Sequence, residues 1–207
     1  MKLSEKILIE VCKKALENSR ELISDADLLK ENNRLPRAYT LYQIAIEESG
    51  KAIYCFVVMF QGDYDDINVQ AEFKEAFLSH LKKTEKSRCL NPSIAQILFK
   101  GDIKGALTFL QESMDERYQL KKINNLKNNS LYTNLIDSEV INPSEVITLN
   151  ILTEIEKRAK LRFKAINAFV TLGINHLSSI RDYQKANPNI EFDVDEMAKE
   201  YWSELLS

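Results

Sequence analysis

The 207-residue chain is predicted to be an all-α protein, an antiparallel helical bundle with additional short helices. Two observations predict this fold class. Only nine residues are glycine or proline, where average usage would give about 25, and so few turn formers do not suit the many tight turns of a β-sandwich or barrel. Apolar residues also recur at four- or seven-residue intervals over long stretches, as they do on one face of a helix.

The first half of the chain is predicted to form three helices. The first covers about residues 4–31, with Ser4 as its N-cap. Pro36 separates it from the second, predicted over 36–60, because the residue before a proline is pushed out of helical geometry. The third is predicted over 69–88 and ends before the next proline.

The second half begins with shorter elements and continues with long helices. The predicted ranges are a short helix over 92–99, a long helix over 103–127 capped by Asp102, an aperiodic stretch over 128–141, a long helix over 144–183 after the start signal at 142–145, and a final helix to Leu206 capped by Asp193 or Asp195. No repeat, low-complexity tract or long linker divides the chain. We therefore expect a single α-helical domain over 1–207, with an acidic C-terminal helix over 191–207.

Composition excludes several classes of protein. With 31 acidic and 28 basic side chains, the net charge is −3, which argues against a generally basic nucleic-acid binder. The longest apolar run, Ala52–Phe60, has nine residues, whereas a membrane span needs about 20, and the charged N-terminus is unlike a signal peptide. Cys12, Cys55 and Cys89 form no C-x-x-C pair, so we expect reduced, buried thiols in a cytoplasmic protein.

The second helix carries an unusual polar group. Glu48 falls on the apolar stripe, where a carboxylate has to be paired or protonated, and Lys51 can reach it along the helix surface. Gly50 costs about 1 kcal/mol relative to alanine inside a helix, which predicts a close neighbour there. The alternative interpretation makes Glu47 and Lys51 a solvated pair and Glu48 a purely structural ion pair.

The two histidines, His80 and His176, do not suit a metal site. Di-iron bundles use paired E-x-x-H motifs, and Phe77 and Gly173 stand where the glutamates would be. We therefore expect no metal and no cofactor. A single histidine on a helix has two possible roles, as a hydrogen-bonded packing residue or as a catalytic one.

Polar and basic segments offer further candidates. Lys127 and Asn128 suit a helix C-terminus, whereas Tyr132 has no obvious role in such a cap. Basic clusters at 82–88, 117–122 and 157–162 are interspersed with acids and suit solvated helix faces, or a phosphate backbone if they converge.

Four of these elements together resemble one family. The pattern A-x-x-L-x-x-x-A-x-E-E-x-G-K-A over 38–52 is similar to the signature helix of the AbiV family of bacterial abortive-infection proteins. The segment 25–29 resembles the end of that family's first helix, 80–83 its H-x-x-K element, and 127–132 its basic-x-x-x-L-Y element. The matching elements occur in the family's order.

The resemblance implies an all-α fold related to the HEPN bundles, which commonly form homodimers. It also implies a phage-defence role, in which an infected cell stops productive protein synthesis in response to a phage protein. Many HEPN relatives are metal-independent ribonucleases with an R-x(4–6)-H motif. This sequence departs from that motif, because Lys127 and Tyr132 stand in its place and tyrosine, with a pKa near 10, is a poor general base at neutral pH.

Three hypotheses follow. In the first, a cytoplasmic homodimer interferes with translation by binding, through Glu47, Glu48, Lys51, His80, Lys83, Lys127 and Asn128. In the second, a degenerate ribonuclease uses His80 as acid and base, Tyr132 as donor and Lys127 to stabilise the phosphorane. In the third, a non-catalytic adaptor captures a protein with its acidic C-terminal helix. The partners expected are a second copy, a phage-encoded activator, and RNA or the translation machinery.

Overall fold

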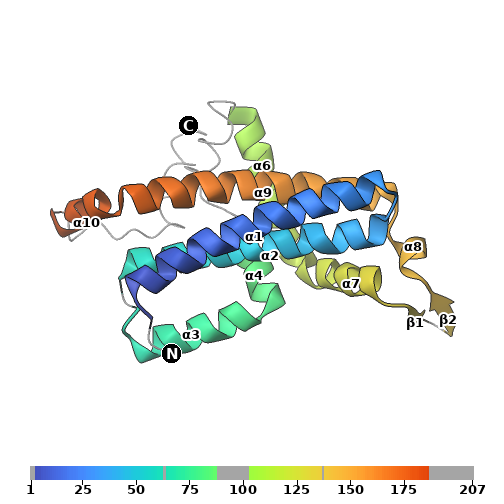
Figure 1. Cartoon of the computed structure of the whole chain (residues 1–207), viewed down its shortest axis with the longest axis horizontal. Helices are drawn as coiled ribbons and strands as arrows, with labels where there is room; N and C mark the ends of the chain where they lie inside the picture. Colours follow the sequence, from blue (N-terminus) through green and yellow to red (C-terminus); the bar gives the residue numbers. More distant parts are fainter. Residues whose placement is uncertain (1–2, 63, 88–102, 137, 187–207) are drawn as a thin grey trace.

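Three helices of 27 residues each run along the molecule: α1 (Glu5–Glu31), α2 (Leu35–Gln61) and α9 (Leu149–Asn175) (Figure 1). The computed structural model describes residues 3–62, 64–87, 103–136 and 138–186. Within these ranges, the two strands of one short hairpin are the only non-helical regular elements. The all-α prediction is confirmed.

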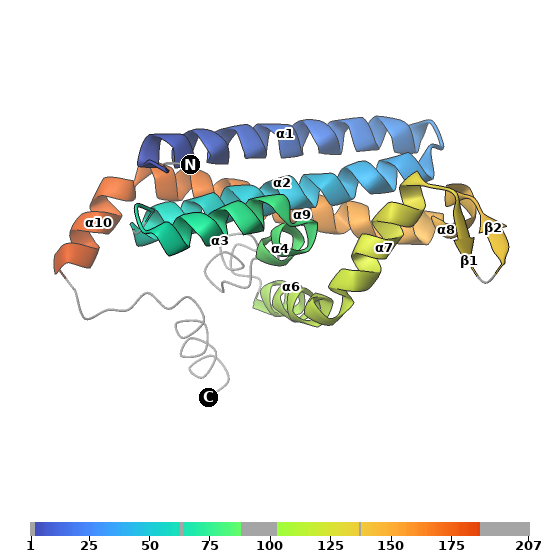
Figure 2. The same cartoon turned by 90° about the horizontal axis from the view of Figure 1, so that it is seen from below.

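Shorter elements complete the bundle. They are α3 (Ile67–Leu78), α4 (His80–Lys86), α6 (Ile103–Asp115), the 3₁₀ turn η1 (Glu116–Gln119), α7 (Leu120–Leu131), β1 (Asn134–Ile136), β2 (Glu139–Ile141), α8 (Pro143–Val146) and α10 (Leu177–Ala186). Figure 2 shows α1 on one side of the layer formed by α2 and α9, with α3, α4 and α6 on the other. α1 is antiparallel to α2, but α9 runs in the same direction as α2, because the segment from α3 to α8 returns the chain to the end where α2 begins.

Two apolar clusters form the core, one along each half of α2. The larger joins α2 to α1, α3, α6, α9 and α10, and its buried members include Leu8, Phe56, Met59, Phe73, Phe109 and Ile166. The smaller joins the start of α2 to the end of α1 and the start of α9, through Ala26, Tyr39, Tyr42, Ile46, Leu152 and Ile155. Between these clusters α2 carries the segment Glu47, Glu48, Ser49, Gly50 and Lys51.

The ends of α1 and α2 follow the sequence closely. The Ser4 hydroxyl accepts a hydrogen bond from the Ile7 amide, as expected of an N-cap. Asn33, with φ of 57°, turns the chain between the two helices. Gly62 ends α2 in left-handed geometry, with φ of 83°, which glycine adopts without strain.

The single helix predicted over 69–88 is wrong, because the chain breaks at Ser79. Ser79 is extended and ends α3, and its hydroxyl accepts from the Lys82 amide to begin α4. A serine hydroxyl can replace a helical hydrogen bond in this way, so a new helix can begin in a new direction. The break lets α4 lie against α2.

Two other long helices are also divided. The helix predicted over 103–127 is interrupted by η1 and then continues beyond its predicted end, to Leu131. The helix predicted over 144–183 separates into α8, α9 and α10, because the Thr148 hydroxyl caps the start of α9 and His176 ends it. The start signal at 142–145 is confirmed, since Asn142 and Glu145 form a capping box.

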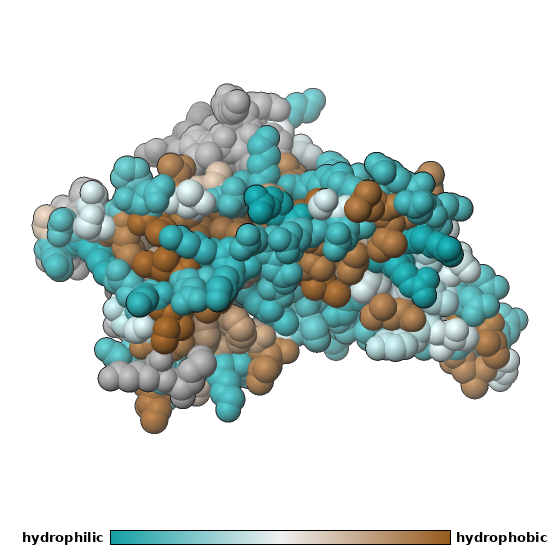
Figure 3. Space-filling view, viewed as in Figure 1, coloured by the Kyte–Doolittle hydropathy of each residue, from teal (hydrophilic) through white to brown (hydrophobic). Residues whose placement is uncertain are grey.

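The stretch predicted to be aperiodic contains the end of α7 and a small hairpin. β1 and β2 are antiparallel, with Leu135 opposite Val140. Both side chains are exposed, and Figure 3 shows apolar surface at the end of the molecule where the hairpin lies. The helices predicted over 92–99 and from Asp193 or Asp195 to Leu206 lie outside the described residues.

Candidate functional site

Glu47 lies in the middle of α2 and is only 2% exposed. Its Oε1 accepts a hydrogen bond from Lys127 Nζ of α7 at 2.8 Å, and its Oε2 lies 2.5 Å from His80 Nδ1 at the start of α4. Lys83, one helical turn further along α4, places Nζ 3.8 Å from the same Oε2. A buried carboxylate is thus surrounded by three basic side chains from two other helices, and we call these four residues the Glu47 site.

The close approach of α4 to α2 depends on Gly50. A Cβ atom at this position would lie 1.9 Å from the carbonyl oxygen of Lys83, so no larger residue fits without moving α4. This confirms the prediction of a close neighbour at Gly50. The contact explains how the Lys83 side chain comes to lie beside Glu47.

Hydrogen bonds between uncharged side chains attach α4 and α7 to the same face of α2. Gln43 Nε2 donates to Thr84 Oγ1 at 3.1 Å, and the hydroxyls of Thr40 and Ser130 lie 2.6 Å apart. Thr40, Gln43 and Glu47 are spaced i, i+3 and i+7, which places them in one row on a helix. This spacing was the available signal for Thr40 and Gln43, which were not predicted as site residues.

Glu48 lies beside the Glu47 site and pairs with Lys51 along α2, as predicted. Both side chains are largely buried, and the Lys51 ammonium also lies 5.4 Å from the centre of the Phe77 ring. The alternative interpretation, a solvated pair between Glu47 and Lys51, is wrong, because Glu47 is buried and bonds to α4 and α7.

Burial lowers the pKa of Lys83 below its ordinary value. The loss of hydration disfavours the ammonium form, and the charges of Lys51 and Lys127 act in the same direction. The carboxylates of Glu47 and Glu48 oppose the shift but do not cancel it. Three lysines against two glutamates leave positive charge in excess here.

His80 is the member of the site that meets solvent, with a side chain that is 60% exposed. A carboxylate oxygen only accepts hydrogen bonds, so Nδ1 donates to Glu47 and Nε2 is the nitrogen left to meet other molecules. Within the described residues Nε2 has no hydrogen-bond partner. The pair can position a proton acceptor at the surface.

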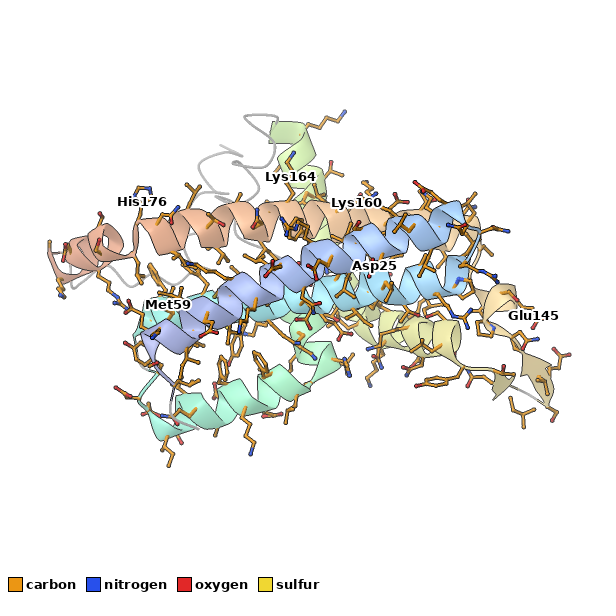
Figure 4. The ribbon with its side chains drawn as sticks, viewed as in Figure 1. Asp25, Met59, Glu145, Lys160, Lys164 and His176 are labelled. Atoms are coloured by element: carbon orange, nitrogen blue, oxygen red, sulfur yellow. The ribbon has the colours of Figure 1, made fainter. Side chains whose placement is uncertain are left out.

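Three other candidate residues, Asn128, Tyr132 and His176, make no side-chain hydrogen bond or ion pair with this cluster in the part of the chain that the structure describes. Asn128 has an exposed side chain and contributes its backbone carbonyl, which accepts from the Tyr132 amide at the end of α7. Tyr132 is 62% exposed. His176 lies at the end of α9 that joins α10, far from α7 (Figure 4). The structure therefore brings together His80, Lys83 and Lys127 with Glu47, but not Asn128, Tyr132 or His176.

A second buried ionic group, which was not predicted from the sequence, connects α9 with η1 and the end of α4. Arg162 is 1% exposed; it donates to Ser87 Oγ at 2.9 Å and pairs with Glu116. Arg158 Nε lies 3.4 Å from the same Glu116 oxygen. Arg162 ends the basic cluster at 157–162, which was predicted to be a solvated helix face, or a phosphate contact if the clusters converge. The solvated face is wrong for Arg162, because its side chain is buried.

The segment that resembles the end of the family's first helix serves to join helices. Asp27 accepts a hydrogen bond from the hydroxyl of the buried Tyr42 on α2 and pairs with Lys160 of α9 at 2.8 Å. Burial and the neighbouring Asp27 carboxylate raise the pKa of Tyr42 far above its ordinary value, so Tyr42 acts here as a donor.

No three His, Cys, Asp or Glu side chains gather as a metal site would require in the described part of the chain. Of the helices in that part, none has the length and apolar character needed to cross a membrane. Cys12 and Cys55 are buried free thiols.

A comparison with protein families matches residues 7–164 to the model described as AbiV, of the HEPN type. The chain belongs to the AbiV family. All four residues of the Glu47 site lie within the matched segment, so this AbiV protein builds its charged cluster from the part of the chain that defines the family. Membership gives the protein a general abortive-infection role of the HEPN type. Comparisons with curated proteins and with solved structures gave no match.

Proposed function

We propose that this AbiV protein restricts phage by interfering with translation in infected cells, and that it does so by binding through the Glu47 site. The observation that carries the proposal is the buried Glu47 carboxylate, which holds Lys127, Lys83 and His80 together while leaving His80 open to solvent. Such a preorganised cluster presents a fixed polar group with positive charge behind it, which suits recognition of an anionic or hydrogen-bonding partner.

The experiment compares two histidine variants in living cells. His80→Ala removes the exposed group of the site, and His176→Ala removes an exposed histidine at the far end of α9. Cells that express each variant are infected, and plaque number and incorporation of labelled methionine are measured. We expect His80→Ala to raise plating efficiency at least tenfold and to restore protein synthesis, while His176→Ala behaves as the parent. Equal restriction by both variants would refute the role of the site.

The proposal includes two partners, a second copy of the chain and a phage-encoded activator. Co-purification from infected cells, with identification of bound protein and sequencing of bound RNA, tests both the activator and the target. Light scattering on the purified protein tests the homodimer. A monomer at micromolar concentration would contradict the dimer without affecting the site.

A second candidate function is metal-independent RNA cleavage, and one observation favours it. The Glu47–His80 pair leaves Nε2 of His80 at the surface, where it could accept a proton from a ribose 2′-hydroxyl. Of the two assisting groups proposed from sequence, Lys127 bonds the same Glu47 carboxylate as His80, so its ammonium is already paired. Tyr132 is 62% exposed and makes no hydrogen bond with the pair within the described residues.

RNA analysis separates the two candidates. Purified protein, with extract from infected cells as the source of activator, is incubated with cellular RNA in EDTA. Cleavage that is lost in His80→Ala would favour the nuclease. Intact RNA, together with blocked translation in the same extract, would favour binding.

A further inference from the structure

A hollow lies between α6 and α9. Figure 2 shows α6 on the side of α2 and α9 that faces away from α1. The hollow consists of two adjoining spaces of about 610 and 500 Å³ that share four lining residues. The shared residues are Phe109, Glu112, Lys157 and Leu161. No residue of the Glu47 site lines either space, so the hollow is a separate feature.

The larger space has a positively charged rim. Four lysines line it, Lys104 on α6 and Lys157, Lys160 and Lys164 on α9, against the single acid Glu112. Lys157 lies 3.7 Å from Glu112, and Lys160 pairs with Asp27 and Glu156.

Lys104 and Lys164 are the other two lysines of the rim. Both are exposed, and neither has an acidic partner within the described residues. Figure 4 shows Lys164 on α9 near α6. In a chain with net charge −3, uncompensated lysines on opposite walls of one hollow indicate an anionic ligand.

The floor of the space is apolar. Phe109 of α6 is buried, and Leu161 of α9 is half-buried beside it. Gly105 and Thr108 add little bulk on the α6 side. The volume falls in the range of small-molecule sites, roughly 300–1,000 Å³, which combine apolar walls with a few polar groups. A ligand that suits both parts carries an apolar group and an anionic group.

We propose that this hollow binds a free nucleotide, with its base against the apolar floor at Leu161 and its phosphates at Lys104 and Lys164. A nucleic-acid strand fits the surroundings less well. Glu154 lines the adjoining space and Glu156 lies one turn before Lys160, so carboxylates interrupt the positive surface that a phosphodiester backbone would follow.

The test is equilibrium binding of a fluorescent ATP analogue to the purified full-length protein. The variant Lys104→Glu/Lys164→Glu reverses the two uncompensated lysines. Its control is Lys6→Glu/Lys13→Glu, which makes the same charge change at exposed positions of α1 that do not line the hollow. Circular dichroism verifies that both variants are folded.

We expect the rim variant to bind at least tenfold more weakly than the parent and the control variant to stay within twofold. Unlabelled ATP or GTP should displace the probe, and adenosine should do so at least tenfold less well, because it lacks phosphates. Raising the salt concentration should weaken binding.

Three results would overturn the proposal: no binding at millimolar probe, equal loss of binding in the rim and control variants, or displacement by a single-stranded RNA oligonucleotide but not by free nucleotides. None of these results bears on phage restriction by the Glu47 site, because the two sets of residues are distinct.

Discussion

Lys127 Nζ donates a hydrogen bond to Glu47 Oε1 at 2.8 Å, across 80 residues of sequence, and both side chains are more than 90% buried. The pair attaches α7 to α2 and holds a carboxylate where water cannot hydrate it. Breaking such a pair costs more than its net contribution, because the remaining charge stays buried.

This relationship predicts strong coupling between the two residues. Lys127→Met and Glu47→Gln should each lower the free energy of unfolding by about 3 kcal/mol, in the range known for breaking one side of a buried ion pair. The double variant should lose clearly less than the sum, since the Lys127 and Glu47 charges are then removed together, while the loss of the carboxylate beside Lys83 is common to both Glu47 variants. Urea unfolding of the four proteins measures the coupling. Additive losses would show that the pair does not act as a unit.

Gly50→Ala tests the contact between α2 and α4. Helix propensity alone would make this change stabilising by about 1 kcal/mol. The new Cβ would meet the Lys83 carbonyl at 1.9 Å, which is backbone and cannot rotate away. We therefore expect a loss of about 1–3 kcal/mol in unfolding free energy, as for other overpacked sites. A more stable variant in the same urea experiment would contradict the close contact.

The lowered pKa of Lys83 predicts that the free energy of unfolding depends on pH. The folded-state pKa is lowered by burial, so between that value and the unfolded value of about 10.5 the unfolded chain binds more protons. The contribution of Lys83 to stability should therefore rise with pH through this window. Unfolding free energies of the parent and Lys83→Met, measured from pH 7 to pH 10.5, give the contribution as a difference. A difference that stays constant or falls with pH would be inconsistent with a lowered pKa.

Arg162 predicts a contrast between two arginines that contact the same carboxylate. Arg162→Lys should cost about 3 kcal/mol, because one ammonium cannot replace the guanidinium that contacts both Ser87 and Glu116 in a buried site. Arg158→Lys is the matched control, since Arg158 is 30% exposed and a partly hydrated ion pair contributes less than about 1 kcal/mol. Similar losses for the two variants in thermal or urea unfolding would contradict this assignment.

The sequence by itself determined the fold class, the ends of α1 and α2, the buried pairing of Glu48 with Lys51 and the close packing at Gly50. Each depends on residues near one another in the chain: caps, prolines, helical spacing and one missing side chain. The resemblance over 38–52 likewise pointed to the family that the match over 7–164 establishes.

Only the tertiary structure decided where the long helical patterns break and which of two neighbouring glutamates enters the site. Ser79 and η1 interrupt helical patterns that local propensity would continue. The break at Ser79 allows His80 to contact Glu47, and the break at η1 allows Glu116 to contact Arg162. The partners of Glu47 are His80, Lys83 and Lys127, which follow it in the chain by 33, 36 and 80 positions. Contacts over such separations leave no local periodicity. Helical spacing describes one helix at a time, whereas the partner of a buried charge is chosen by the helices that pack against it.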